Sequence, residues 1–176
     1  MLAFRSSPPD QFNARATRED WWTRCDPALA FENADLAALV AIWKSARGTR
    51  QMPVRSDLTP RALGRHLRNI AFVERVAPAG TARRYRFGFF GSSLARRMGD
   101  HTGKFVDEVI RPPYLEAWHA GYDMMCEWKA PVRYISTLRS LNLEFLSTES
   151  AIMPFADETG AVACFLLSAA FSPLVK

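Results

Sequence analysis

The side chains that could carry out chemistry are few and scattered along this sequence. Its histidines are His66, His101 and His119, and none of them lies in a G-x-S-x-G, Walker or zinc-binding motif. Hydrolytic or acid–base catalysis needs a base, a partner for it and an oxyanion donor that converge. The sequence therefore assigns no catalytic residue, and we do not expect an enzyme.

The cysteines likewise indicate neither a metal site nor redox chemistry. Cys25, Cys126 and Cys164 are odd in number, widely spaced, and form no C-x-x-C and no cluster with histidine. This pattern is typical of reduced thiols in a cytosol and predicts no metal site. The N-terminus lacks the apolar block of a signal peptide, and no run approaches the roughly 20 apolar residues of a membrane helix. We expect a cytoplasmic protein without a membrane partner.

Charge is distributed unevenly over the chain. The net charge is +5; residues 31–100 carry thirteen Lys and Arg against five acids, and residues 101–176 carry six against nine. Arg61, Arg65 and Arg68, at i, i+4 and i+7, are either a solvated helix face or an anion-binding stripe, because guanidinium groups hold phosphate bidentately. No recognition helix, zinc finger or aromatic-studded strand accompanies them, so we do not expect a nucleic-acid partner.

The elements that would position these side chains begin with an N-terminal appendage, residues 1–30, which has no sustained period. Its Trp21 and Trp22 are too apolar for a loose tail, which indicates docking on the domain or on a second subunit. Residues 31–69 predict helices: an apolar stripe runs between a capping Asn33 and a terminating Gly48. The stripe consists of Leu36, Leu39, Val40 and Trp43. Thr59 before Pro60 opens a second, short helix.

From Ile70 the period changes to that of strands. Ile70–Val76 and Arg84–Phe90 predict a hairpin around the turn at 78–80, with Tyr85, Phe87 and Phe89 on one buried face. A long helix over 113–128 follows, and then strands over 132–138, 143–155 and 162–171. The last strand is apolar almost throughout, which indicates a central strand covered on both faces.

This order of elements resembles that of a PAS domain, most closely a compact, stand-alone bacterial branch of the family. The motifs that carry the resemblance are Arg47-Gly48, Asp57-Leu58-Thr59-Pro60, Leu67-Arg68-Asn69-Ile70, Arg84-Tyr85-Arg86 with Gly91, Asp100-His101-Thr102-Gly103 and Ile152-Met153-Pro154-Phe155. The resemblance implies an α+β fold, a PAS-like five-stranded antiparallel sheet with helices on one face, preceded by N-terminal helices. The domain itself would span residues 70–172.

The resemblance also implies a small cavity between sheet and long helix, used for sensing a small ligand or for docking a signalling protein, usually in a homodimer. The candidate cavity residues are Phe87, Phe89, Trp118, His119, Tyr122, Phe145 and Phe165. We expect no cofactor. The alternative is haem, because His119 lies on the helix that supplies the iron ligand in haem-binding relatives. A second alternative is a cavity enzyme that transfers protons through Asp123 or Glu144.

Overall fold

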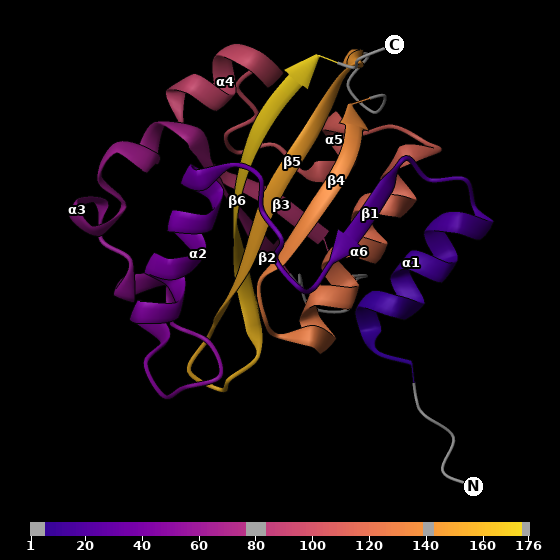
Figure 1. Cartoon of the computed structure of the whole chain (residues 1–176). Helices are drawn as coiled ribbons and strands as arrows, with labels where there is room; N and C mark the ends of the chain where they lie inside the picture. Colours follow the sequence, from indigo (N-terminus) through magenta and orange to yellow (C-terminus); the bar gives the residue numbers. More distant parts are fainter. Residues whose placement is uncertain (1–5, 77–83, 139–142, 174–176) are drawn as a thin grey trace, which may run out of the picture.

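The chain folds around one antiparallel sheet of six strands, in the order β1-β4-β5-β6-β2-β3 (Figure 1). The computed structural model describes residues 6–76, 84–138 and 143–173, with side chains described except at Leu138 and at 143–145. The strands are β1 (Thr23–Asp26), β2 (Ile70–Val76), β3 (Arg84–Phe90), β4 (Val132–Leu138), β5 (Leu143–Ala156) and β6 (Val162–Pro173). The PAS-like α+β fold is confirmed, with six strands in place of the expected five.

Helices cover both faces of this sheet. They are α1 (Pro8–Arg18), α2 (Ala34–Arg47), α3 (Pro60–Leu63), α4 (Ser92–Met98), α5 (Val106–Val109) and α6 (Tyr114–Trp128), with short 3-10 turns at Arg55–Asp57 and Gly64–Asn69. On one face the Glu149 carboxylate accepts a hydrogen bond from Asn33 N, at the start of α2. On the other face the Phe165 ring lies 4.9 Å from the ring of Tyr122 in α6.

The expectation of helices on one face was therefore too narrow, because α2 packs on the face opposite α6. The side chains of β6 explain why both layers are needed. Successive side chains of a strand point to opposite faces, and Cys164, Phe165, Leu166 and Leu167 are all buried. The prediction of a central last strand covered on both faces is confirmed.

The local signals around the second helix act as expected. The Asn33 side chain accepts hydrogen bonds from the backbone N–H groups of Asp35 and Leu36, which satisfies unpaired donors in the first turn. Gly48 ends the helix with φ = +56°, a conformation that costs glycine little. The Thr59 hydroxyl caps α3 in the same way, accepting from Ala62 N at 3.2 Å.

The hairpin predicted from Ile70 pairs as required: β2 lies between β3 and β6, antiparallel to both. Its turn at 78–80 lies outside the described residues. The expected inward position of Phe89 is wrong. Phe72 pairs with Phe89 and Val73 with Phe87, so Gly88 is an extra residue that forms a bulge. The bulge shifts the alternation by one residue, so Phe90 is buried and Phe89 is 36% exposed.

The described part of the appendage, residues 6–30, packs on its own chain. Ser7 and Asp10 form a capping box at the start of α1, and β1 pairs antiparallel with β4. Asn13 donates to Cys25 O at 2.7 Å and accepts from Cys25 N at 2.8 Å. The Asn13 side chain thereby occupies the free edge of β1 much as another strand would. Within the described ranges, no helix is both long and apolar enough to cross a membrane.

Candidate ligand cavity

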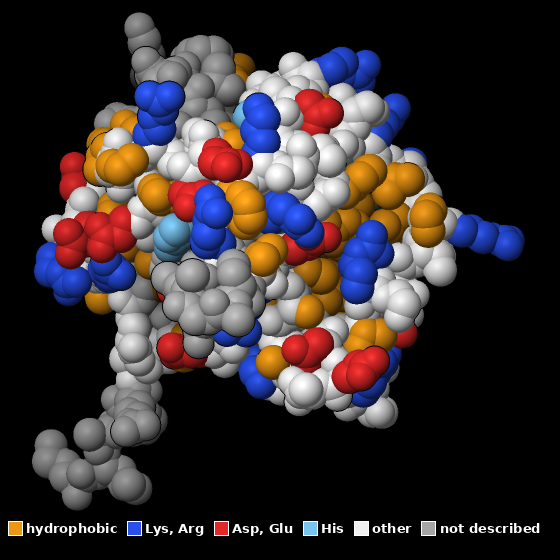
Figure 2. Space-filling view, turned by 180° about the vertical axis from the view of Figure 1, so that it is seen from behind, with side chains coloured by type: hydrophobic (Ala, Val, Ile, Leu, Met, Phe, Trp, Pro, Cys, Tyr) orange, Lys and Arg blue, Asp and Glu red, His pale blue; other side chains and the backbone are white. Residues whose placement is uncertain are grey.

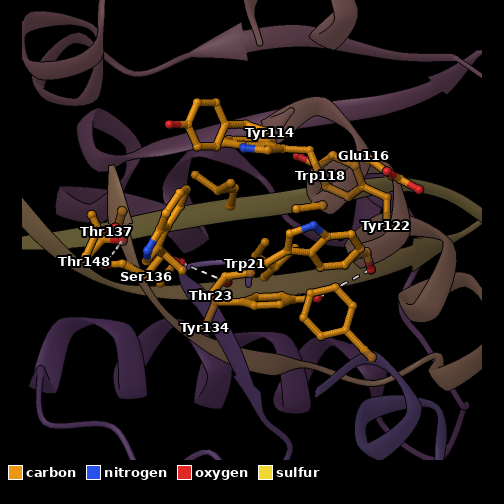
Figure 3. A pocket seen from close by; sticks show the side chains of 18 of the residues that line it. Trp21, Thr23, Tyr114, Glu116, Trp118, Tyr122, Tyr134, Ser136, Thr137 and Thr148 are labelled. Carbon is orange, nitrogen blue, oxygen red and sulfur yellow. Dashed lines mark hydrogen bonds between the residues drawn. The ribbon is translucent and has the colours of Figure 1, made fainter. Parts of the chain in front are cut away.

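A cavity of about 320 Å³ lies between α6, the facing side of β4, β5 and β6, and the segment that joins α1 to β1 (Figure 3). This volume would hold about ten water molecules at roughly 30 Å³ each. It falls at the lower end of the range of small-molecule sites, roughly 300–1,000 Å³. Residues 19–23 form one wall, so the appendage helps to build the cavity.

Aromatic side chains make up much of the wall. They come from the appendage, α6, β4 and β6 and are Phe12, Trp21, Trp22, Tyr114, Trp118, Tyr122, Tyr134 and Phe171. The Trp22 and Tyr114 rings lie 5.7 Å apart between centroids, in a tilted arrangement. A Cβ on Gly121 would lie 3.1 Å from the Tyr134 hydroxyl, tighter than ordinary contact, so the glycine lets the Tyr134 ring approach α6 closely.

Small hydroxyl side chains from the sheet gather at one end of the cavity, and the rings of Trp21, Trp118 and Tyr122 lie toward the other (Figure 3). The hydroxyl-bearing residues are Thr23, Ser136, Thr137, Thr148 and Ser150. The Thr23 and Ser136 hydroxyls are 3.0 Å apart, and Thr148 donates to Ser136 O at 3.3 Å. These groups can donate and accept hydrogen bonds, which would orient a bound molecule.

Tyr122 also lines the cavity, and its hydroxyl is buried with no hydrogen-bond partner among the described residues. The residue is only 2% exposed, and this burial raises the pKa of the phenol well above its usual value. Burial of a hydroxyl without a partner is costly. The Tyr122 hydroxyl is therefore an uncharged, buried group rather than a polar group of the cavity surface.

Two of the seven predicted cavity residues line the cavity, Trp118 and Tyr122. Phe87 lies behind them, with its ring 6.5 Å from Trp118, and Phe165 packs on Tyr122. Phe89 lies on the face of the sheet opposite the cavity, beside Phe72. On that face Arg55 and Phe155 cover the Phe72 ring. The side chain of Phe145 lies outside the described residues.

His119 is placed away from the cavity. Its ring lies 5.8 Å from that of Tyr85, and it is not among the described residues that line the cavity. None of those residues is a histidine, so the histidine ligand on which the haem alternative rested is not in the cavity wall. No cluster of three potential metal ligands occurs in the described parts of the chain. The haem alternative therefore has no support from this geometry.

The carboxylates suggested for proton transfer are not in the cavity wall either. Asp123 accepts a hydrogen bond from the Tyr85 hydroxyl at 2.7 Å and is solvent exposed. The side chain of Glu144 lies outside the described residues. The acids that do border the cavity are Glu19, Asp20 and Glu116, all three exposed and therefore at its mouth.

The arginines of the predicted stripe lie in different surroundings. Arg65 is paired with Asp35 at 2.7 Å on the surface. Arg68 instead borders a shallow depression with Arg96 and Arg97 from α4. On the side of the molecule seen in Figure 2, Lys and Arg side chains are interspersed with Asp and Glu side chains.

Comparison with known proteins finds a similarity to one family. Residues 31–107 match the family model described as PAS domain. Over this range the chain is similar to PAS domains. Among solved structures it is similar to the light-state structure of the blue-light photoreceptor Aureochrome1 LOV, with a TM-score of 0.38 and 9% sequence identity, over 66% of this chain and 88% of that chain. No curated protein matches the sequence.

The range matched to the PAS family contains only Met98 of the residues that line the cavity. Most of the wall comes from α6, from β4 to β6 and from the appendage ahead of the PAS match. Sequence reasoning missed the hydroxyl side chains of β4 and β5, whose small polar residues give no signal of a cavity. It did single out Trp21 and Trp22, whose apolar surface had to be covered.

Proposed function

We propose that this PAS-like domain is a sensory module that binds a small ligand in the cavity between α6 and the sheet, and that it acts by binding rather than by catalysis. The observation that carries the proposal is the cavity itself, with aromatic walls and hydroxyl groups at one end. Sites of this kind, mostly apolar with a few converging polar groups, are the usual sites of small molecules.

A ligand can shift a protein between two arrangements only by its differential affinity for them. The segment of residues 19–23 is the element best placed to respond, because it forms part of the wall. It is held on both sides, by Asn13 bracketing Cys25 and by an ion pair between Arg15 and Glu116. Ligand binding would stabilise residues 19–23 in their position against the cavity, and the exchange of backbone amide hydrogens in β1 would slow.

The proposal is tested with N-phenyl-1-naphthylamine, a neutral dye whose fluorescence rises in apolar surroundings. Ala117 lines the cavity from α6, so Ala117→Phe would place a ring inside it. Ala41 lies exposed on α2 and serves for the same substitution outside the cavity. We expect the dye to bind the wild type and Ala41→Phe equally, and Ala117→Phe at least tenfold more weakly. Equal binding by all three folded proteins would refute a ligand site at this place.

A second candidate function is docking of an acidic protein segment. Arg68, Arg96 and Arg97 converge on one depression, which has no acidic residue among its described lining. Charge reversal at Arg96 should weaken binding of a poly-glutamate peptide several-fold in low salt, and reversal at the exposed Arg61 should not. No binding by the wild type, or equal loss with both variants, would rule this site out.

Homodimer formation through residues 1–30 stays a prediction. The full chain should sediment as a dimer at micromolar concentration, and a monomer at every concentration would refute it.

A further inference from the structure

The side chains that line the cavity differ in charge from the whole chain. The protein has 23 Lys and Arg against 18 Asp and Glu. Among the described residues that line the cavity there is no Lys, Arg or His, whereas Glu19, Asp20 and Glu116 stand at its mouth. The arginines nearby lie outside the lining: Arg15 pairs with Glu116 and lies over the Trp21 ring, Arg18 pairs with Glu19, and Arg97 lies over the Phe171 ring. An anion in the cavity would therefore meet carboxylates, but no cation, among the described lining residues.

The walls are also suited to a positive charge. The faces of Trp and Tyr rings carry negative electrostatic potential, and they attract ammonium groups that come within about 6 Å of the ring centre. Trp21, Trp22 and Tyr114 line the cavity together with the mouth carboxylates.

We propose that the ligand of this cavity is a small organic cation, an ammonium group on an apolar or aromatic body, and that Asp20 and Glu116 select it against anions. This inference rests on the proposed ligand-binding function. Selection arises because the carboxylates lower the free energy of a cation at the mouth and raise that of an anion, while the aromatic walls hold the apolar body of either.

The backbone provides a clean variant for the test. Asp20 has φ = +52°, in the left-handed region, which asparagine and aspartate adopt more readily than most other non-glycine residues. Asp20→Asn therefore removes the charge while keeping both the shape and the backbone conformation. Glu116→Gln removes the charge at the start of α6 and also ends the ion pair with Arg15, so Arg15→Gln, which ends the same pair and keeps the acid, is measured beside it. Glu158→Gln, in the exposed turn between β5 and β6, removes an acid outside the cavity lining and is the matched control.

The experiment measures three probes of nearly equal size by isothermal titration calorimetry at low salt: phenethylamine, 2-phenylethanol and phenylacetate. We expect phenethylamine to bind at least tenfold more tightly than phenylacetate, with 2-phenylethanol between them. Asp20→Asn and Glu116→Gln should each weaken phenethylamine about threefold, as expected for a charge several ångströms away in a partly solvated site. They should leave 2-phenylethanol unchanged, and Glu158→Gln should change nothing.

The outcomes separate this inference from the proposed function. Binding led by 2-phenylethanol or phenylacetate, or a preference for phenethylamine that the Asp20 and Glu116 variants leave intact, would overturn the cation assignment and leave a ligand site. If none of the three probes binds and the neutral dye does not bind either, the cavity is not a ligand site and both proposals fail.

Discussion

Arg133 allows a sharp test of how burial changes the value of an ion pair. Its guanidinium contacts Glu149 at 2.6 Å, Asp26 at 3.4 Å and Glu32 at 3.6 Å, and its side chain is 10% exposed. The Glu149 side chain is 13% exposed and also accepts hydrogen bonds from Glu32 N and Asn33 N at 2.8 Å. This network, on the α2 face of the sheet, joins β4, β5, β1 and the start of α2.

The perturbation is Arg133→Met, which keeps an apolar stem and removes the charge. Breaking a buried pair by removing one partner costs about 3–5 kcal/mol, because the other charge remains buried without compensation. Two backbone N–H groups still stabilise the Glu149 carboxylate, so we expect the lower end, about 3 kcal/mol. For a domain of this size that lowers Tm by about 6–12 °C.

Arg86→Met is the matched control, because Arg86 also lies in a strand and pairs with Glu74 at 2.6 Å, with both side chains more than 40% exposed. Solvent screens such a pair, which contributes about 0–1 kcal/mol. Urea unfolding at pH 7 measures both variants. If Arg133→Met costs no more than Arg86→Met, burial does not set the value of these pairs and the reasoning is wrong.

Three further predictions concern pH and the backbone. Burial alone would raise the pKa of Glu149, but hydrogen bonds from Glu32 N, Asn33 N and Arg133 lower this pKa below the ordinary 4.5. The ionised carboxylate therefore stabilises the fold above pH 4.5, and this stabilisation is lost as the pH falls through the folded pKa. Urea titrations of Glu149→Gln should show a shallower loss of stability below about pH 5 than those of the wild type, and equal slopes would contradict this. A Cβ on Gly91 would lie 2.5 Å from Arg68 O, so Gly91→Ala should destabilise by about 2 kcal/mol or more in urea unfolding, and a neutral effect would show that the two segments can separate freely. Lys129 ends α6 at φ = +55°, so Lys129→Gly should stabilise the fold by roughly 1 kcal/mol and raise Tm. A lower Tm would show that the hydrogen bond from Lys129 to Gly160 O contributes more than the left-handed backbone costs.

Much of the fold could be predicted from the sequence because the signals are local. The Asn33 and Thr59 caps, the apolar stripe of α2 and the period change at Ile70 each depend on residues within a few positions of one another. The long helix and the three strands after it were placed to within a few residues for the same reason. The bulge at Gly88 was missed, because a glycine in a strand fits both regular pairing and a bulge until its partner strand is known.

The candidate site was predicted less well. Trp118 and Tyr122 were found because the face of a helix follows from its period. His119 was placed in the cavity by resemblance, but its ring turns toward Tyr85 instead. The orientation of a residue at the edge of a helical face depends on what packs beside the helix, and here α1 and β1 occupy one side of α6.

The sequence by itself determined the PAS-like order of elements, the boundaries of the main helices and strands, and the apolar core of β6, because helix and strand periods are written in neighbouring residues. Only the tertiary structure decided that Thr23–Asp26 is a strand, since its pairing depends on β4, more than a hundred residues later. The tertiary structure alone also determined where the cavity lies and that acidic side chains stand at its mouth. A cavity is the difference between the space that the elements enclose and the volume of their side chains, and no local pattern of residues encodes that difference.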